Sequence, residues 1–358
     1  MDDFDLDYVE IYVQDLAAQV DAWCGQYGFE AIATGGSQEQ GFHSLVLGQG
    51  RMRVVLTEAI AEDHPAARYV LAHGDGVANI ALRTMDIKRA LTQVLAAGGQ
   101  LVSELRDHQD DDVVLSAAVS GFDNVVHTLL QRRTPVAGLP PGFRWLPKNE
   151  KAPGRNPGPE LLEIDHFAIC LRVGLLNPAV DAYRKAFGFS VVFQERVVVG
   201  DQAMLSKVIR SRTGSVTFTL IQPDPSAAPG QIDEFLHSHS GSGVQHIAFS
   251  AADIVRAVTA LSAAGVEFQS TPQEYYDSVT ERVSLQRHPL SDLRALSILA
   301  DQDHGGQLFQ IFTRSNHDRR TIFFEVIERR GAETFGSANI RALYEAVEAG
   351  RAEKVAGR

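Results

Sequence analysis

The sequence predicts an α+β protein built from four similar strand–helix–strands units, two in each of two domains. Three observations lead to this prediction: the length of 358 residues, a proline-rich stretch near the middle, and an internal repeat on either side of that stretch. Domains of roughly 100–200 residues are usual, so the length favours two domains over one.

The clearest repeat relates residues 76–98 to residues 243–265 at a constant offset of 167 residues. The first segment reads GVANIALRTMDIKRALTQVLAAG, and the second reads GVQHIAFSAADIVRAVTALSAAG. Each copy begins with an alternating strand, continues with an aspartate suited to cap a helix N-terminus, and ends at a glycine. The same pattern of strand, capped helix and glycine therefore occurs in both halves.

A fainter repeat relates the starts of the two halves. Residues 7–13, DYVEIYV, parallel residues 165–171, DHFAICL. Together the two repeats place the starts of the four units near residues 8, 77, 164 and 244. Repeats of this kind decide the architecture before any motif is considered. We expect the N-terminal domain to be a diverged copy of the C-terminal domain.

Proline marks the boundary between the domains. Seven of the 14 prolines lie between residues 135 and 159, where neither helical nor strand periodicity is present. We predict an N-terminal domain over residues 1–134, a connecting segment over 135–160 and a C-terminal domain over 161–358. The alternative, one long loop inside a single domain, is less favoured because structureless loops of that length are uncommon.

Composition excludes several classes of protein. With 33 Lys+Arg against 45 Asp+Glu, the formal net charge is −12, which argues against broad binding to nucleic-acid phosphates. No apolar run approaches the roughly 20 residues that span a bilayer, and the acidic first residues do not resemble a signal peptide. Two cysteines are too few for a disulfide framework. We expect a cytoplasmic protein that acts on a small molecule, without nucleic-acid or membrane partners.

Two histidines distinguish the C-terminal half from the N-terminal half. His166 and His246 lie on predicted strands, and each is followed two positions later by an alanine on the same face, which leaves room beside the imidazole. The N-terminal copies have Tyr8 and Asn79 at these positions. The repeat thus kept the strands and lost both imidazoles.

Glu325, like the two histidines, is present only in the C-terminal copy of the repeat. It lies within the apolar run Phe-Phe-Glu-Val-Ile, whereas the N-terminal copy has Thr128 at this position. A buried carboxylate needs a cation or a proton. Two histidines and one carboxylate form the facial triad typical of non-haem Fe(II) oxygen enzymes, although Zn²⁺, Mn²⁺, Co²⁺ and Ni²⁺ accept the same ligands. We predict that His166, His246 and Glu325 bind one metal ion.

Other histidines are weaker candidates. His237 and His239 form a His-x-His pair, but they lie where a predicted helix meets a glycine-rich turn. His304 lies in Asp-His-Gly-Gly, a sequence typical of a turn. No nucleotide-binding glycine loop, Cys-x-x-Cys pair or serine nucleophile motif is present.

With these residues in place, the chain resembles the vicinal oxygen chelate superfamily, whose paired βαβββ units build an open barrel around a metal (a glyoxalase-like fold). Within it, the chain resembles the 4-hydroxyphenylpyruvate dioxygenase family over nearly its whole length. The motifs that carry this resemblance are Ile164-Asp165-His166-Phe167-Ala168, Gly243-Val244-Gln245-His246-Ile247-Ala248, Gln310-Ile311-Phe312-Thr313, Phe323-Phe324-Glu325-Val326-Ile327 and Phe335-Gly336-Ser337-Ala338-Asn339.

The resemblance implies that the three ligands bind Fe(II) (Fe²⁺). It also implies that the substrates are 4-hydroxyphenylpyruvate, which chelates the metal through its α-keto acid, and O₂. The residues that the resemblance implies to contact the substrate are Ser206, Thr219, Ile221, Gln231, Gln310, Phe312, Phe323, Ile340 and Tyr344. For the two phenylalanines the alternative is plain core packing, and for Ser206 and Gln231 it is ordinary strand or loop polarity.

Two departures from the family pattern bear on the product. Ile340 stands where ring-hydroxylating members normally have Phe, and Ile221 stands where they normally have Asn. Both changes favour the branch that forms 4-hydroxymandelate, with Ile340 as the product-determining residue. Two alternatives stay open: a dioxygenase that forms homogentisate, and a metal-free binding protein of the same fold. A homodimer formed through the N-terminal domain is also expected.

Overall fold

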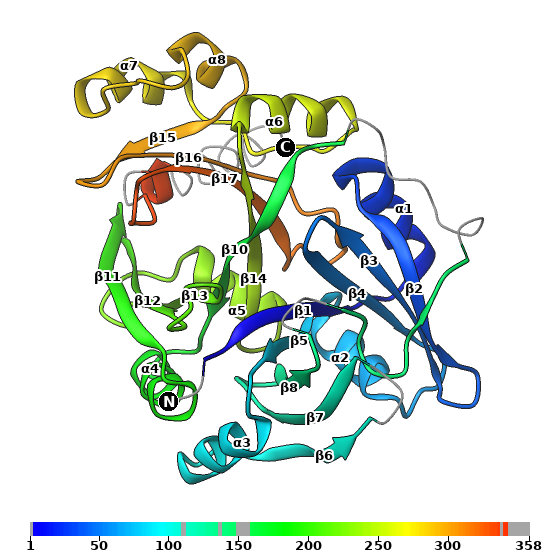
Figure 1. Ribbon diagram of the computed structural model, residues 1–358. Coiled ribbons are helices and arrows are strands. Elements are labelled where there is room, and N and C mark those ends of the chain that lie inside the picture. The colour runs from blue at the N-terminus through cyan, green and yellow to red at the C-terminus, as the bar shows by residue number, and fades with distance from the viewer. Residues whose placement is uncertain (1–2, 109–111, 135–137, 148–157, 337–338, 343–358) are drawn as a thin grey trace.

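The computed structural model describes residues 3–108, 112–134, 138–147, 158–336 and 339–342. Within these ranges the chain forms two curled sheets, one in each half, with helices packed on their outer faces (Figure 1). In Figure 1 the N-terminal sheet is coloured blue to teal, and the C-terminal sheet green to orange. The predicted α+β architecture of two open barrels is confirmed.

The elements are as follows. The N-terminal strands are β1 (Asp5–Tyr12), β2 (Glu30–Ser37), β3 (Phe42–Gln49), β4 (Met52–Ala59), β5 (Gly76–Arg83), β6 (Leu101–Asp107), β7 (Val113–Ser120), β8 (Val126–Arg132) and β9 (Arg144–Trp145). The C-terminal strands are β10 (Leu161–Cys170), β11 (Ser190–Val199), β12 (Gln202–Arg210), β13 (Thr217–Pro223), β14 (Gly243–Ala251), β15 (Leu299–Gln302), β16 (Gln307–Phe312) and β17 (Phe323–Arg330). The helices are α1 (Leu16–Tyr27), α2 (Pro65–His73), α3 (Ile87–Ala96), α4 (Leu176–Phe187), α5 (Gln231–Ser238), α6 (Ile254–Ala263), α7 (Gln273–Arg282) and α8 (Leu290–Ala295).

The strand order shows the duplication directly. The N-terminal sheet runs β2-β3-β4-β1-β5-β8-β7-β6, with β9 added beside β2, and the C-terminal sheet runs β11-β12-β13-β10-β14-β17-β16-β15. The two orders are the same, strand for strand. In each barrel the first strand of one unit pairs antiparallel with the first strand of the next, β1 with β5 and β10 with β14. The four predicted units are therefore present and paired as expected.

The repeated helices begin and end where the sequence predicts. In α3 the Asp86 carboxylate accepts a hydrogen bond from the Arg89 amide at 3.1 Å, and in α6 Asp253 accepts one from the Arg256 amide at 3.0 Å. Each of these helices is followed by a glycine with positive φ, which the residue after a helix often adopts. Aspartate and glycine thus mark both ends of the repeated element.

One apolar core continues through both halves. Trp23 of α1 packs edge-on against Phe324 of β17, with ring centroids 5.0 Å apart. The counterpart contact joins Tyr183 of α4 to His127 of β8, where the tyrosine hydroxyl lies 2.7 Å from the imidazole Nε2. Each half therefore places a helix against the outer face of the other half's sheet, which fixes the two barrels relative to each other.

The predicted connecting segment does more than join the halves. Arg144–Trp145 forms β9 and pairs with β2. Leu139 and Phe143 pack against the apolar cluster inside the N-terminal barrel. A two-residue strand is too short to show a period, so the sequence pattern did not reveal that this segment covers a barrel. In the described part of the chain, no helix has the length and apolar character needed to cross a membrane.

Candidate metal centre

Three adjacent strands bring the predicted ligands together. His166 lies on β10 opposite Ala248 of β14, and Ala248 lies beside Glu325 of β17. His246 comes one row further along β14, opposite Ala168 of β10. Alternation on each strand points all these side chains to one face. The two alanines therefore lie between or beside the ligands and leave the space that the sequence predicts.

The donor atoms converge on one point. Glu325 Oε2 lies 3.4 Å from His166 Nε2 and 3.3 Å from His246 Nε2. One donor atom from each of the three residues lies within 4.8 Å of the others. All three side chains are buried. Ligands about 2.1 Å from one shared ion lie roughly 3 Å apart, so the spacing is that of a common metal site.

The remaining polar atom of each ligand is held by another side chain. Asp165 Oδ1 lies 2.8 Å from His166 Nδ1, and Gln245 Oε1 lies 3.3 Å from His246 Nδ1. Gln310 donates from Nε2 to Glu325 Oε1 at 2.8 Å. An imidazole that donates its Nδ1 proton presents the lone pair of Nε2, which is the form that binds a metal. Gln245, which directly precedes His246 in the chain, is thereby placed to orient that imidazole.

The electrostatics of the trio favour a bound cation. Burial opposes protonation of His166, but Glu325 and Asp165 outweigh it and raise the His166 pKa to about 9. Burial lowers the pKa of His246, whose orienting neighbour is an uncharged amide. Burial would raise the pKa of Glu325, yet the two imidazoles lower it to about 2. The carboxylate is therefore ionised, and it is balanced by a proton on His166 or by a metal ion.

These residues fit a divalent transition metal. Two imidazole nitrogens and one carboxylate oxygen are the donor set of the 2-His-1-carboxylate facial triad, whose open positions accept substrate and O₂ in non-haem iron enzymes. The trio, the orienting partners and the alanine gaps all lie in the C-terminal barrel. The donor set alone does not distinguish Fe(II) from Mn²⁺, Co²⁺ or Zn²⁺.

Hydroxyl and apolar side chains continue the same face away from the metal ligands. Thr219 of β13 lies beside Ala168, and Ser206 of β12 lies opposite Ile221. All of these side chains are buried. Among the described residues, the Thr219 hydroxyl has no hydrogen-bond partner. A buried hydroxyl without a partner is costly unless a ligand or water binds it.

Aromatic rings flank His246. The ring centroid of Phe323 lies 5.0 Å from that of His246 in a stacked arrangement, and the Phe312 centroid lies 5.8 Å away, edge-on. Both phenylalanines therefore lie beside His246, and their contact with a substrate stays a prediction. Gln310 is engaged at both ends of its amide, because it donates to Glu325 and accepts from Asn339 Nδ2 at 2.9 Å.

The other predicted contacts lie further from the ligands or outside the described residues. Ile340 is half-buried and packs against the apolar cluster that includes Ile221 and Met204. Gln231 begins α5 and lines a small cavity together with Met204. Tyr344 falls outside the described residues.

The weaker histidine candidates do not join a metal-donor group in the described part of the chain. His239 is buried and stacks on His73, with ring centroids 4.5 Å apart, so it belongs to the contact between the halves. His237 is exposed, and His304 lies on the surface 3.9 Å from Glu333.

A second group of potential donors occurs away from this centre, formed by Asp253, His288 and Glu328. Its carboxylates already have cationic partners. Arg330 Nε lies 2.6 Å from Glu328, and Arg287 Nη2 lies 3.0 Å from Asp253. This group is a charge-balanced network that ties α6 to the end of β17.

The contacts behind His166 were not predicted from the sequence. The Arg329 guanidinium donates two hydrogen bonds to the Asp165 carboxylate, from Nε at 2.8 Å and from Nη2 at 2.9 Å. Phe335 packs edge-on against His166 at 5.1 Å. The available signal was the aspartate that precedes the first ligand position in both halves, at residues 7 and 165.

Comparisons with known proteins agree with this geometry. The Glyoxalase/Bleomycin resistance protein/Dioxygenase superfamily matches residues 163–311 and, through a second description of the same superfamily, residues 7–115. The chain is 30% identical to 4-hydroxyphenylpyruvate dioxygenase of Yarrowia lipolytica over 97% of this chain and 92% of that protein. It is 28% identical to the enzyme of the same name from Dictyostelium discoideum, over 96% of each chain.

A solved structure gives a stronger match. A triple mutant of 4-hydroxymandelate synthase from Streptomyces coelicolor is 39% identical, with a TM-score of 0.88, and the match covers 98% of this chain and 100% of that one. Whole-length similarity, the duplicated fold and the converging ligands all lead to one assignment. The chain belongs to the 4-hydroxyphenylpyruvate dioxygenase family and is an enzyme of the dioxygenase class.

Proposed function

We propose that this protein is an Fe(II)- and O₂-dependent 4-hydroxymandelate synthase, which converts 4-hydroxyphenylpyruvate into 4-hydroxymandelate and CO₂. The observation that carries this proposal is the 39% identity over the full length to a protein of that name. The two isoleucines of the pocket support it, because Ile221 and Ile340 belong to one apolar cluster inside the C-terminal barrel. The curated relatives carry the dioxygenase name at lower identity.

His166, His246 and Glu325 would hold the iron, and Asp165, Gln245 and Gln310 would orient them. When bound, Fe(II) would supply the binding site for the α-keto acid and a redox centre through which the substrate's electrons reach O₂. The protein's own contribution is to fix the ligand directions and to exclude water with buried side chains.

The substrate's aromatic ring needs a binding surface beyond the metal. Phe312 and Phe323 offer ring faces and edges next to His246. The unpartnered hydroxyl of Thr219 suits a hydrogen bond to the substrate's phenol, and Ser206 lies on the neighbouring strand. We assign these two hydroxyls to recognition of the phenol end.

Pocket shape would then select the product. Hydroxylation of the benzylic carbon gives 4-hydroxymandelate, whereas attack on the ring gives homogentisate. The two carbons are close together, so a small change in the tilt of the ring decides which one is reached. An aliphatic Ile340 in place of a flat aromatic ring leaves space for a tilt that favours the benzylic carbon.

Product identification tests this function. The purified enzyme is incubated with Fe(II), ascorbate and 4-hydroxyphenylpyruvate under air, and the acid products are separated by chromatography against both standards. We expect 4-hydroxymandelate as the main product. Homogentisate as the main product would establish the dioxygenase alternative. No product, no bound metal by elemental analysis, and unchanged ligand binding in His166→Ala would establish a metal-free binding protein.

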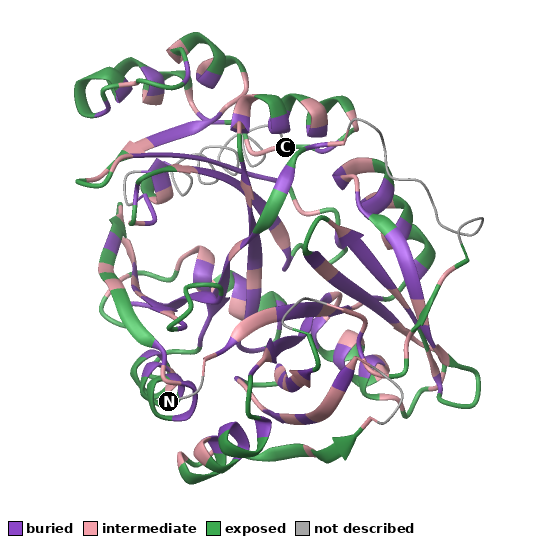
Figure 2. Cartoon of the chain, in the orientation of Figure 1, coloured by how far each residue is buried: buried purple, intermediate pink, exposed green. Residues whose placement is uncertain are grey.

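We also propose that the protein is a homodimer formed through its N-terminal domain. All residues of β6 but one are exposed, and the strand is coloured almost wholly green in Figure 2. Its exposed large apolar side chains are Leu101, Val102 and Leu105. Met85, just before α3, and Leu95, in its last turn, are exposed as well. A second copy would bury this apolar surface. Sedimentation equilibrium should give a dimer mass that Leu105→Lys reduces to a monomer; a monomeric wild type would refute the proposal.

A further inference from the structure

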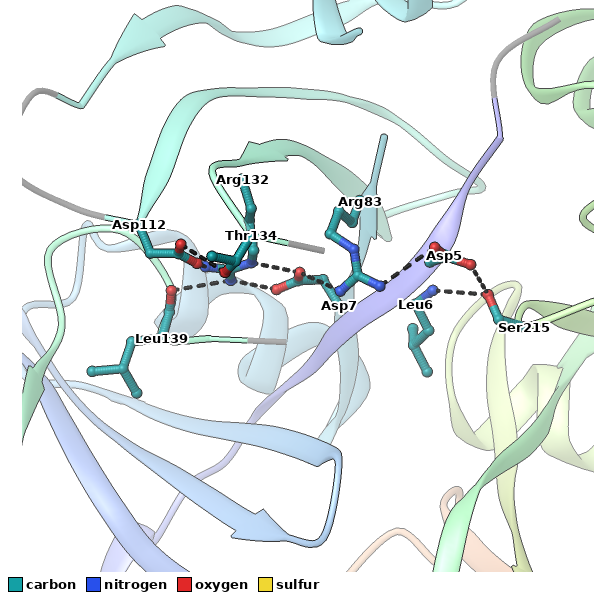
Figure 3. Close-up of polar contacts among 9 residues, drawn as sticks. All are labelled: Asp5, Leu6, Asp7, Arg83, Asp112, Arg132, Thr134, Leu139 and Ser215. Carbon is teal, nitrogen blue, oxygen red and sulfur yellow. Dashed lines mark hydrogen bonds and ion pairs between the residues drawn. The ribbon is translucent and has the colours of Figure 1, made fainter. Parts of the chain in front are cut away.

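The same ion pair occurs in both barrels. In the N-terminal barrel Arg132 donates from Nε to Asp7 Oδ2 at 2.7 Å and from Nη2 to Asp7 Oδ1 at 2.5 Å (Figure 3). In the C-terminal barrel Arg329 binds Asp165 through the same pairs of atoms, at 2.8 and 2.9 Å. These four residues occupy equivalent places in the repeat, on β1 and β8 in one barrel and on β10 and β17 in the other. The pair persists in a barrel without the ligand trio, so metal binding is not needed to form it.

Each arginine also holds the chain that follows its strand. Arg132 Nη2 donates to the Leu139 carbonyl at 3.1 Å, and Arg329 Nη1 donates to the Thr334 carbonyl at 2.6 Å. Figure 3 shows Leu139 beside the ion pair of the N-terminal barrel. Leu139 belongs to the segment that covers that barrel. Thr334 leads into Phe335, whose ring lies 4.7 Å below the Arg329 guanidinium and 5.1 Å from His166.

The C-terminal pair has one additional partner. Asp165 Oδ1, which accepts from Arg329 Nη2, also lies 2.8 Å from His166 Nδ1. In the N-terminal barrel the counterpart of His166 is Tyr8, whose side chain hydrogen-bonds to Thr128 and interacts with Asp7 and Arg132 through their charges. Among the described residues, therefore, the ion pair of the C-terminal barrel contacts both a proposed metal ligand, His166, and the segment 332–336 that covers the barrel. The ion pair of the N-terminal barrel contacts a covering segment but no such ligand.

We propose that Arg329 is a positioning residue that couples the seating of residues 332–336 to the orientation of the metal ligand His166. This inference rests on the proposed metal centre. The planar guanidinium fixes the plane of the Asp165 carboxylate by two parallel bonds, and that plane sets the direction of the Asp165–His166 hydrogen bond. The same guanidinium holds the Thr334 carbonyl and stacks on Phe335, so the covering segment cannot leave without loosening the support of the ligand.

Arg329→Lys tests this coupling, with Arg132→Lys as the matched control. Lysine keeps the positive charge but cannot donate two parallel hydrogen bonds to the carboxylate. Two readouts are used: the affinity and visible absorption spectrum of Co(II) added to metal-free protein, and amide hydrogen exchange in metal-free protein. The amides of Glu333 and Thr334 donate to the Asp303 carboxylate, both at 2.8 Å, so their protection reports the seated segment.

For Arg329→Lys we expect Co(II) affinity to fall about 10–100-fold, as for loss of a residue that orients a metal ligand. We also expect an altered Co(II) spectrum and faster exchange at residues 333 and 334. For Arg132→Lys we expect lower stability and faster exchange at Leu146, whose amide bonds to the Ile32 carbonyl, with an unchanged Co(II) spectrum. The proposal would be overturned if both variants changed Co(II) affinity and the Co(II) spectrum equally. It would also be overturned if Arg329→Lys changed neither Co(II) binding nor amide exchange.

A second variant covers the case in which Arg329→Lys does not fold. Phe335→Leu keeps the ion pair and removes the ring between Arg329 and His166. We expect faster exchange at residues 333 and 334 and a shifted Co(II) spectrum; unchanged exchange and spectrum would contradict the coupling. A wild type that fails to bind Co(II) would instead refute the metal centre, and the exchange comparison in metal-free protein would still test the hold on the segment.

Discussion

The two barrels have equivalent strands in the same order, but the side chains inside them differ. Where the C-terminal barrel gathers His166, His246 and Glu325, the N-terminal barrel has Tyr8, Asn79 and Thr128. There, Asn79 Nδ2 donates to Thr128 Oγ1 at 2.8 Å, and the Thr128 amide donates to Asn79 Oδ1 at 3.0 Å. The N-terminal trio is uncharged and its members hydrogen-bond to one another, so it has no need of a cation.

The barrels also differ at the position beside the ligands, where one has Glu10 and the other Ala168. Glu10 lies opposite Asn79 on β1, as Ala168 lies opposite His246 on β10. The Glu10 carboxyl accepts hydrogen bonds from Thr57 Oγ1 at 2.8 Å and from Asn79 Nδ2 at 3.2 Å, and burial raises its pKa. Glutamate thus fills the room that alanine leaves free. In this chain, the barrel that has the ligand trio is also the one that has small residues beside it.

The barrels also differ in what covers them. Leu139 and Phe143 of the connecting segment pack into the N-terminal interior. The C-terminal interior is covered by Phe335, which contacts His166, and by Ile340, which packs on the apolar cluster of the pocket. One cover completes a core and the other borders a ligand site.

Removing the carboxylate ligand should produce the largest effect. Glu325→Gln keeps the side-chain shape but loses the negative charge that a metal requires. We expect metal content to fall to background and activity to fall by more than about 100-fold, the upper end for loss of a mere orienting partner. Elemental analysis and oxygen-uptake rates measure both. Thr128→Val, the matched change in the other barrel, should leave both unchanged; full metal content in Glu325→Gln would contradict the ligand assignment.

Filling the alanine gap tests the importance of empty space. Ala168→Glu gives the C-terminal barrel the residue that the N-terminal barrel has at Glu10. We expect turnover to fall by about 100-fold, since a misplaced group near the reacting centre can cost this much. Steady-state kinetics with 4-hydroxyphenylpyruvate measure it, with Glu10→Ala as the control of unchanged turnover. Near-normal turnover in Ala168→Glu would show that the gap is not needed.

The contacts between the halves should differ in their response to pH. Burial lowers the pKa of His127 to about 4 from an ordinary value of 6.5, although its hydrogen bond to the Ile80 carbonyl opposes this. Between these values the unfolded chain binds more protons than the folded one. The free energy of unfolding therefore has its full value, as far as His127 is concerned, above pH 6.5. It decreases as the pH falls, by about 2 kcal/mol at pH 5.

The double variant His127→Phe/Tyr183→Phe imitates the other contact, in which Phe324 meets Trp23 and neither ring titrates. Urea unfolding at pH 7 and pH 5 should show a smaller loss of unfolding free energy in this variant than in the wild type. Equal losses in both proteins would contradict the account of His127.

The smallest expected effect concerns the product. Ile340→Phe places an aromatic ring against the pocket cluster, and we expect the ratio of homogentisate to 4-hydroxymandelate to rise several-fold. Ile340→Leu, which stays aliphatic, should leave the ratio close to that of the wild type. Chromatography of the acid products measures the ratio. An unchanged ratio in Ile340→Phe would argue that residues other than Ile340 set the tilt of the ring.

The repeat and the strand alternation were enough to predict the four units and the trio, because these depend on local periodicity and on positions that the duplication preserves. The hydrogen bond from Gln310 to Glu325 and the fork between Asp165 and Arg329 were not predicted. The first joins the consecutive strands β16 and β17, the second joins β10 to β17, and the geometry of both depends on how these strands pair. The cover over the N-terminal barrel also depends on tertiary packing. The substrate contacts and the product stay predictions, since pocket shape follows from how side chains such as Ile340 pack.

The most direct test is a crystal structure of the protein loaded anaerobically with Fe(II), with anomalous diffraction measured at the iron edge. The account predicts one iron per chain, bound by His166 Nε2, His246 Nε2 and Glu325 at about 2.0–2.2 Å, and no iron among Tyr8, Asn79 and Thr128. Iron bound elsewhere, or a fully loaded crystal in which these three side chains do not share an ion, would contradict it.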